Sequence, residues 1–298
     1  MVRLSDVAEP EPASNEVVVA VEAFSINRGE TFLLENPQPG WRPGKDVAGR
    51  VVRAAADRTG PPVGARVVGH PPSGGWAEYA AIPTNRLAVL PEQIDAPTAA
   101  ALPLAGLTAL RLVRAAGTIV GSIAGRRVLL TGAAGGVGHF FVELAAAEGA
   151  HVHVVVHTAE RGQRLGELGA SRVLLDVTEA PPNMDVVLES VGGASFVGAL
   201  GRLAPRGLLV WFGQASRTAP TIDFFSFFAG HRSATIRHFD YTDSDVSDAQ
   251  DLARLVQLVG AGRLHPEIGL TASWAETAAR IADLRERRIR GKVILIPE

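Results

Sequence analysis

The sequence predicts an α/β protein that joins a doubly wound parallel sheet to an irregular β-barrel-like domain. Three observations support this prediction. The first hundred residues are short β-branched runs between proline and glycine turns, and from about residue 98 apolar strands alternate with helical segments. At the first strand–helix junction of that alternation stands the glycine-rich stretch "TGAAGGVGH", residues 131–139.

The N-terminal part is predicted to be built of short strands. Residues 16–22, 46–52 and 65–69 are rich in valine, and turn signals such as Pro61-Pro62 and Pro71-Pro72 lie between and after them. Short strands with frequent turns are typical of barrel-like β-domains.

The second part is predicted to consist of βαβ units with parallel strands. Its strands are near-continuous Val/Leu runs, as expected where helices cover both faces of a sheet. We expect strands at residues 127–130, 151–156, 172–175, 185–188 and 208–211, helices at 137–148, 161–168, 247–259 and 275–286, and a last strand at 292–296.

The glycine-rich stretch has the spacing of a dinucleotide-binding turn. Ala133 stands where such turns usually have their first glycine, Gly135 would let the backbone approach a pyrophosphate, and Gly138 would let the helix pack closely on the strand. The helix N-terminus would then attract the negative charge. The alternative is a glycine-rich turn that binds no ligand.

The end of the second strand favours NADPH over NADH. NAD-binding proteins usually carry an acidic residue there, whereas this strand ends at His157-Thr158 and is followed by Arg161. An arginine suits a 2′-phosphate because its guanidinium binds phosphate oxygens in pairs. Glu160 opposes this interpretation unless it only favours the helix dipole, and Arg161 could instead be a solvated helix residue.

Composition excludes several classes of function. The net charge of −2 gives no broad basic surface for nucleic acid, and the absence of cysteine excludes disulfides, four-cysteine zinc sites and thiol nucleophiles. The first residues have no apolar signal-peptide core, and no run reaches about 20 apolar residues. We therefore expect a cytoplasmic protein with neither a membrane nor a nucleic-acid partner.

Seven segments in order along the chain carry a family resemblance. The chain resembles the medium-chain dehydrogenase/reductase superfamily, in particular its zinc-free NADPH:quinone oxidoreductase and zeta-crystallin-like branch. The segments are "SINRGE" at 25–30, "PGKDVAGRV" at 43–51, "GGWAEYA" at 74–80, "ALPLAGLTAL" at 101–110, "VLLTGAAGGVG" at 128–138, "DVVLESVGG" at 185–193 and "RGKVILIP" at 290–297.

The resemblance implies a domain organisation and a set of site residues. It implies a GroES-like catalytic domain at residues 1–108, a Rossmann NADP-binding domain at 109–245, and a return to the catalytic domain at 246–298. It also implies an active site in the cleft between the domains, and a homodimer. Asn27 would face nicotinamide and substrate, Thr108 would lie near the nicotinamide, and Arg161 would hold the 2′-phosphate. The other expected cofactor-binding residues are Ala134, Gly135, Gly136, Val137, His157, Thr158, Val191, Phe212, Gly213 and Lys292.

The chain departs from the family pattern at two points. Phe32 stands where a tyrosine often follows the asparagine, so a tyrosine acid is not expected there. The usual first strands before "VRLSDVAEPEP" are absent, so either the start of the gene is misassigned or the first domain has a trimmed start.

The chemistry expected is hydride transfer without a metal. His151, His153 and His157 lie along one strand of the cofactor domain, where packed or solvated histidines are favoured over zinc ligands, and no G-x-S-x-G turn supports a hydrolase. Without a Lewis acid, a quinone or an activated C=C (enone or enoyl) acceptor is favoured, because its charge is delocalised onto an oxygen. Tyr241 is a candidate proton donor.

Two questions stay open from the sequence. The phenylalanines of "DFFSFF", residues 223–228, could line the substrate site or belong to a dimer interface or core. The whole chain could also be a non-catalytic NADPH-binding protein of the zeta-crystallin type, structural or sensory, because its cofactor site would look the same.

Overall fold

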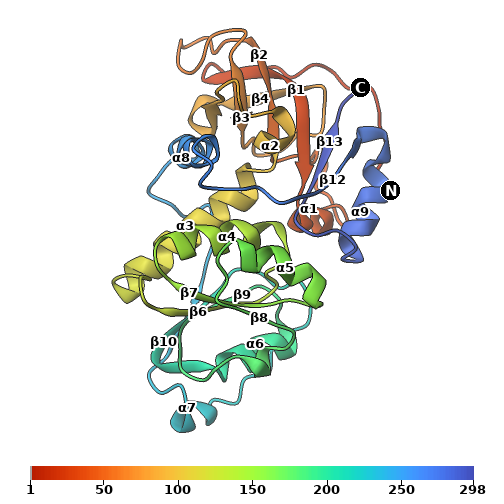
Figure 1. The fold of residues 1–298 in the computed structure, drawn as a ribbon. Helices are drawn as coiled ribbons and strands as arrows, with labels where there is room; N and C mark the ends of the chain where they lie inside the picture. The colour runs from red at the N-terminus through yellow and green to blue at the C-terminus, as the bar shows by residue number, and fades with distance from the viewer. Residues whose placement is uncertain (1) are drawn as a thin grey trace. The chain divides into compact units, whose positions relative to one another are not determined.

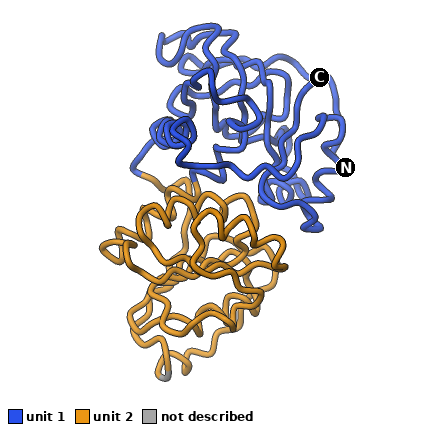
Figure 2. The backbone as a smooth tube through the Cα atoms, in the orientation of Figure 1, with its two compact units in different colours: residues 1–107, 245–298 blue, residues 108–244 orange. Residues whose placement is uncertain are grey.

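The computed structural model describes residues 2–298 and consists of two compact units (Figures 1 and 2). Unit 1 is formed by residues up to 107 together with residues 245–298, and unit 2 by residues 108–244. The chain therefore leaves unit 1 once and returns to it near the C-terminus.

Unit 1 is built on a seven-stranded sheet with the order β12-β13-β1-β2-β3-β5, in which β4 also pairs with β1. The pairings are antiparallel except between β12 and β13. Its elements are β1 (Glu16–Ile26), α1 (Arg28–Leu33), β2 (Val47–Arg53), β3 (Arg66–Gly69), β4 (Tyr79–Pro83), η1 (Thr84–Arg86), β5 (Leu87–Val89), α2 (Ala96–Ala100), the start of α3 (Pro103–Val120), α8 (Asp248–Gly260), β12 (Ile268–Ser273), η3 (Trp274–Glu276), α9 (Thr277–Arg285) and β13 (Lys292–Ile296).

The pairing of β1 with β13 joins the two ends of unit 1. Antiparallel register matches Phe24 with Leu295 and Ile26 with Val293. These side chains belong to one buried apolar core, whose transfer out of water favours this register. One step further along both strands, the register brings Asn27 beside Lys292.

Unit 2 is a six-stranded parallel sheet with the order β11-β10-β9-β6-β7-β8. Helices α4 and α5 cover one face and α6 the other (Figure 1). Its elements are β6 (Arg127–Leu130), α4 (Gly136–Ala147), β7 (His151–Val155), α5 (Ala159–Glu167), β8 (Arg172–Leu174), η2 (Val177–Glu179), β9 (Met184–Glu189), α6 (Gly193–Leu200), β10 (Leu203–Trp211), α7 (Ser226–Ala229) and β11 (Thr235–His238).

The strand order of unit 2 reverses between β6 and β9. The chain runs outward from β6 through β7 to β8, then returns to the other side of β6 and continues through β9, β10 and β11. In open α/β sheets, ligands bind beyond the carboxyl ends of the strands at such a switch point. The carboxyl ends of β6 and β9 therefore mark where a ligand site is expected in unit 2.

The predicted fold class is confirmed, with an antiparallel GroES-like sheet and a parallel Rossmann-type sheet. Within the described residues, one helix, α3, is long and apolar enough to cross a membrane. About half of it, 56%, is buried inside the fold, as in the core helix of a globular protein. The sequence did not predict helices α1, α6 and α7 or strands β4, β5, β11 and β12.

Candidate functional site

The glycine-rich turn of unit 2 joins β6 to α4. Gly138 packs against the turn so closely that a Cβ atom would lie 2.0 Å from the carbonyl oxygen of Ala133, so only glycine fits. At Gly135 the space is open, because a Cβ atom would meet nothing nearer than the oxygen of Gly132 at 3.5 Å. No side chain caps the first turn of α4. Gly135 is exposed and Gly136 and Val137 are half-buried, so together with the backbone of buried Ala134 they form a turn at a helix N-terminus, which fits a phosphate group.

A second group of predicted residues lies at the carboxyl end of β7, the strand paired with β6. His157 and Thr158 are exposed, and the Thr158 hydroxyl caps α5 by accepting a hydrogen bond from the backbone N–H of Arg161 at 3.4 Å. Arg161 is half-buried in the first turn of α5, next to exposed Glu160. Because the strand end carries no carboxylate, the local charge suits a 2′-phosphate better than a ribose hydroxyl.

The remaining predicted residues of unit 2 lie beyond β9 and β10 or in α3. Val191 accepts a backbone hydrogen bond from Ser216 at 2.8 Å, and Phe212 donates one to the carbonyl of Glu189 at 3.0 Å. Gly213 follows Phe212 at the end of β10. Thr108 is buried in α3.

Tyr241 lies after β11, with its backbone carbonyl accepting a hydrogen bond from the Arg111 guanidinium at 2.7 Å. Its side chain is half-buried. The backbone at this position is therefore tied to α3 through Arg111.

Sequence reasoning missed a buried carboxylate at the end of β9. Glu189 is fully buried, and its oxygens accept hydrogen bonds from the backbone N–H groups of Val191 and Gly192 and from the hydroxyls of Thr131 and Ser195, at 2.9–3.1 Å. An acidic residue closing the apolar strand "DVVLE" was the available signal.

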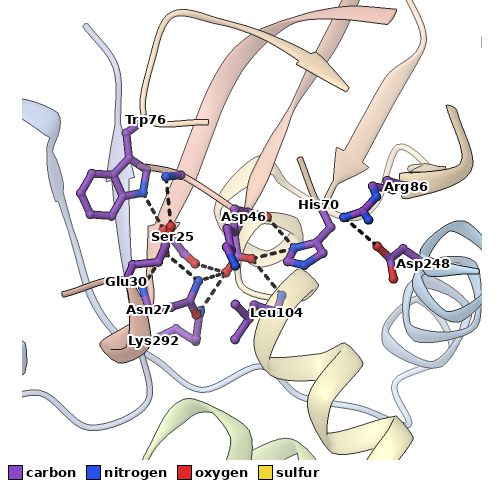
Figure 3. A network of polar contacts seen from close by, with 12 residues as sticks. Ser25, Asn27, Glu30, Asp46, His70, Trp76, Arg86, Leu104, Asp248 and Lys292 are labelled. Carbon is purple, nitrogen blue, oxygen red and sulfur yellow. Dashed lines mark hydrogen bonds and ion pairs between the residues drawn. The ribbon is translucent and has the colours of Figure 1, made fainter. Parts of the chain in front are cut away.

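Unit 1 contains a buried polar network centred on Asp46 (Figure 3). One carboxylate oxygen accepts hydrogen bonds from the Lys292 ammonium at 3.0 Å, the Asn27 amide at 2.8 Å and the Ser25 hydroxyl at 2.5 Å. The other oxygen accepts a hydrogen bond from the backbone N–H of Leu104 at 2.8 Å. Asp46 and Ser25 have 0% of their surface exposed, whereas Asn27 keeps 6% exposed, so the network reaches the surface at Asn27.

The side chain of Asn27 is held on three sides. Its amide nitrogen donates to Asp46 and, at 3.1 Å, to Glu30, while its oxygen accepts a hydrogen bond from Lys292 at 2.6 Å. A primary amide has two N–H donors and an oxygen with two lone pairs. Both donors of Asn27 are therefore engaged, and one lone pair of its oxygen remains.

Glu30 belongs to the same network through a capping box. Asn27 is the N-cap of α1, Glu30 is the third residue of that helix, and the Glu30 carboxylate accepts from the backbone N–H groups of Asn27 and Gly44 at 3.1 and 3.0 Å. The spacing N-x-x-E in "NRGE" is a capping-box pattern. This pattern is the signal in the sequence that points to Glu30.

The two acids of the network titrate in opposite directions. Burial alone would raise the pKa of the Asp46 carboxyl, but the Lys292 ammonium, assisted by His70 and Ser25, holds that pKa well below its usual range. Burial raises the pKa of Glu30, and the nearby charge of Asp46 raises it further, against the hydrogen bonds from Asn27 and Gly44. Of the two acids, Asp46 is therefore the one whose negative charge the network stabilises.

Residues 2–298 contain no group of three or more His, Asp or Glu side chains arranged to hold a metal ion. On β7, His151 is exposed and His153 is buried, and burial lowers the pKa of His153. These histidines do not form a ligand set with the acids described above.

Two family models match successive parts of the chain. Residues 13–92 match the alcohol dehydrogenase GroES-like domain and residues 168–295 match a domain described as zinc-binding dehydrogenase. This pair of domains defines the class as medium-chain dehydrogenase/reductases.

Relatives that match nearly the whole chain identify the family within this class. The chain is 30% identical to a quinone oxidoreductase of Pseudomonas aeruginosa over 98% of its length and 94% of the relative's, and 28% identical to a 2-haloacrylate reductase of a Burkholderia species over 85% and 81%. The structure superposes on Escherichia coli quinone oxidoreductase complexed with NADPH with a TM-score of 0.85 at 25% identity, covering 98% of this chain and 95% of that one. The chain belongs to the quinone oxidoreductase family of the medium-chain dehydrogenase/reductases.

Proposed function

We propose that this protein is an NADPH-dependent, zinc-independent oxidoreductase that reduces a quinone or an activated C=C bond (an enone or enoyl substrate). The observation that carries the proposal is the carboxyl edge of β6 and β7, where an open glycine turn lies beside a strand end that has no acid and a helix start that carries Arg161. The relative of known structure that binds NADPH supports this choice of cofactor.

The proposed cofactor site lies along the carboxyl edge of the unit 2 sheet. The pyrophosphate would be held by the backbone of residues 134–137 and the N-terminus of α4, because N–H groups and the helix dipole both favour an anion there. Arg161, with His157 and Thr158 beside it, would hold the 2′-phosphate. Val191, Phe212 and Gly213 would line the nicotinamide half, and Thr108 would help to fix it.

The acceptor class follows from the groups that the chain supplies. When bound, NADPH supplies the hydride. With no cysteine in the chain and no metal-ligand cluster in residues 2–298, the protein supplies hydrogen bonds and position. A quinone or an enone needs least help, because its carbonyl oxygen takes up the developing charge.

Asn27 would act through its oxygen. Since Glu30 and Asp46 engage both of its N–H donors, the remaining lone pair on the oxygen suits the amide N–H of the nicotinamide better than an acceptor carbonyl. Lys292 would then serve the cofactor indirectly, by fixing that oxygen at 2.6 Å. With Phe32 in place of a tyrosine, the proton would come from water or from Tyr241.

The rival function is a non-catalytic NADPH-binding protein. Oxidation of NADPH by the purified protein, measured with a panel of quinones and enones, separates the two. The proposal expects turnover with at least one member of the panel. Tight NADPH binding without oxidation by any acceptor would favour the rival.

A homodimer in the cytoplasm is part of the proposal. Strand β11 is an edge of the unit 2 sheet, and all four of its residues are exposed. Nearby Phe224, Phe225 and Phe228 are 70%, 81% and 79% exposed, whereas Phe227 packs against the core of unit 2. Exposed edges and aromatic patches favour association, and a two-fold axis would cover both. Light scattering on Phe225→Ser should show a shift toward monomer, and an unchanged dimer would place the contact elsewhere.

A further inference from the structure

The Glu189 carboxylate is the meeting point of three segments at the switch point of unit 2. It accepts hydrogen bonds from the end of β6 through Thr131, from the loop after β9 through the backbone of Val191 and Gly192, and from the first turns of α6 through Ser195. All of these partners are neutral donors. A buried carboxylate is tolerated only when such donors replace its water, so each of these groups is held to it.

Thr131 connects the hydrogen bonds of Glu189 to the glycine turn. Its hydroxyl donates to Glu189 at 3.0 Å and accepts a hydrogen bond from the backbone N–H of Ser190 at 3.1 Å. The Ser190 hydroxyl in turn donates to the Thr131 carbonyl at 3.3 Å. Thr131 immediately precedes Gly132, so the glycine turn and the β9 loop are fastened to each other.

Because of these contacts, the glycine turn and the β9 loop are both held by the Glu189 carboxylate. The backbone N–H groups of Val191 and Gly192 both donate to the Glu189 carboxylate, at 2.9–3.1 Å. Without the carboxylate these N–H groups would lose their partner, and the loop would lose its fixed position relative to the turn.

We propose that Glu189 is a positioning residue of the cofactor site, acting with Thr131 to hold the glycine turn and the β9 loop at the spacing that NADPH requires. This inference rests on the proposed function of unit 2 as the NADPH-binding part of the protein. Glu189 is fully buried and acts through the loops rather than by touching the cofactor. A residue that only stabilised the fold would change the free energy of unfolding and leave the affinity of the folded protein unchanged.

The test compares four variants for NADPH binding by fluorescence titration and for amide hydrogen exchange of the free protein. Glu189→Gln keeps the shape but turns an amide N–H toward backbone donors, Thr131→Val removes only the hydroxyl, and Thr131→Ser retains it. Glu148→Gln, at an exposed position of the same unit, is the matched control.

We expect the dissociation constant to rise about 10-fold or more in Glu189→Gln and about 5-fold in Thr131→Val, as for buried donors left without partners. Thr131→Ser and Glu148→Gln should stay within about twofold of wild type on the same grounds. Exchange at Val191 and Gly192 should become faster in Glu189→Gln. If Glu189→Gln does not fold, the NADPH dissociation constants of Thr131→Val and Thr131→Ser are compared instead, and only Thr131→Val should bind more weakly than wild type.

Equal affinities for Thr131→Val and Thr131→Ser, or a folded Glu189→Gln that binds as wild type does, would overturn the inference. Wild-type protein that does not bind NADPH would instead overturn the proposed function. The exchange experiment on the free protein would in that case still report whether Glu189 holds the loop.

Discussion

Replacing Lys292 by methionine tests the charge balance of the buried network in unit 1. Methionine keeps much of the length of the side chain and removes the ammonium that lies 3.0 Å from Asp46 and 2.6 Å from the Asn27 oxygen. The Asp46 carboxylate is then left fully buried without the ammonium, with hydrogen bonds from Asn27, Ser25 and Leu104 and with the His70 ring 3.6 Å away.

The size of the effect follows from which partners remain. Removing one member of a buried ion pair costs about 3–5 kcal/mol, because the other charge stays buried without compensation. Asp46 keeps hydrogen bonds from Asn27, Ser25 and Leu104, so a loss of about 3 kcal/mol in the free energy of unfolding is expected. Changing Asp46→Asn in addition removes the charge and should restore at least about 1 kcal/mol.

The pH dependence gives an independent check. In wild type the pKa of Asp46 is depressed, so its contribution to stability is present above the unfolded value of 3.8 and is lost as the pH falls through the folded pKa. Without Lys292, burial raises the pKa of Asp46, so the variant should regain stability relative to wild type as the pH falls from about 7 toward 4.

Urea unfolding followed by circular dichroism measures these differences. Arg50→Met is the control, because the ion pair of Arg50 with Glu22 is exposed and should matter by less than about 1 kcal/mol. A Lys292→Met protein that loses less than about 1 kcal/mol at pH 7, or that is not rescued by the change at Asp46, would refute the reasoning.

Four other predictions concern cofactor, acceptor, pH and metal. Arg161→Ala should weaken NADPH binding by about 1–3 kcal/mol in titrations while hardly changing NADH, and a wild type that binds both equally would contradict this. Asn27→Ala should lower kcat about 10–100-fold in NADPH oxidation assays with NADPH affinity less affected, and an unchanged rate would remove Asn27 from the site. Burial raises the pKa of Glu30 above 4.5 in the folded protein, so wild type should lose stability relative to Glu30→Gln as the pH rises from 4.5 through that folded pKa. Urea unfolding of both proteins at several pH values measures this difference, and a difference that stays constant with pH would contradict the prediction. Elemental analysis should find no stoichiometric zinc and a chelator should spare activity, whereas about one zinc per chain lost together with activity would argue for a metal site.

Much of the fold was accessible from local patterns. The parallel strands of unit 2 are continuous apolar runs, and the turn at residues 131–139 carries its own spacing, so both can be read without knowing what lies nearby. Strand β11 was missed because all four of its residues are exposed and it carries no apolar alternation.

The polar networks were less accessible because they depend on long-range pairing. Lys292 reaches Asn27 and Asp46 across 265 and 246 residues of sequence, through the pairing of β1 with β13. Nothing local at "RGKVILIP" indicates that its lysine meets an acid. At Glu189 the acid that closes the strand is visible in the sequence but its burial is not, since an acid at a strand end is usually solvated and is buried only when the chain turns back over it.

The central claim is that this protein uses bound NADPH to reduce an activated C=C bond or a quinone. Its most direct test is reduction of an enone with NADPH deuterated at the transferred position, with the product analysed by mass spectrometry. The account predicts one deuterium on the product carbon, retained in water, together with stoichiometric oxidation of the cofactor. An enone that is consumed without gaining deuterium, or a protein that binds NADPH and oxidises it with no enone or quinone, would contradict it.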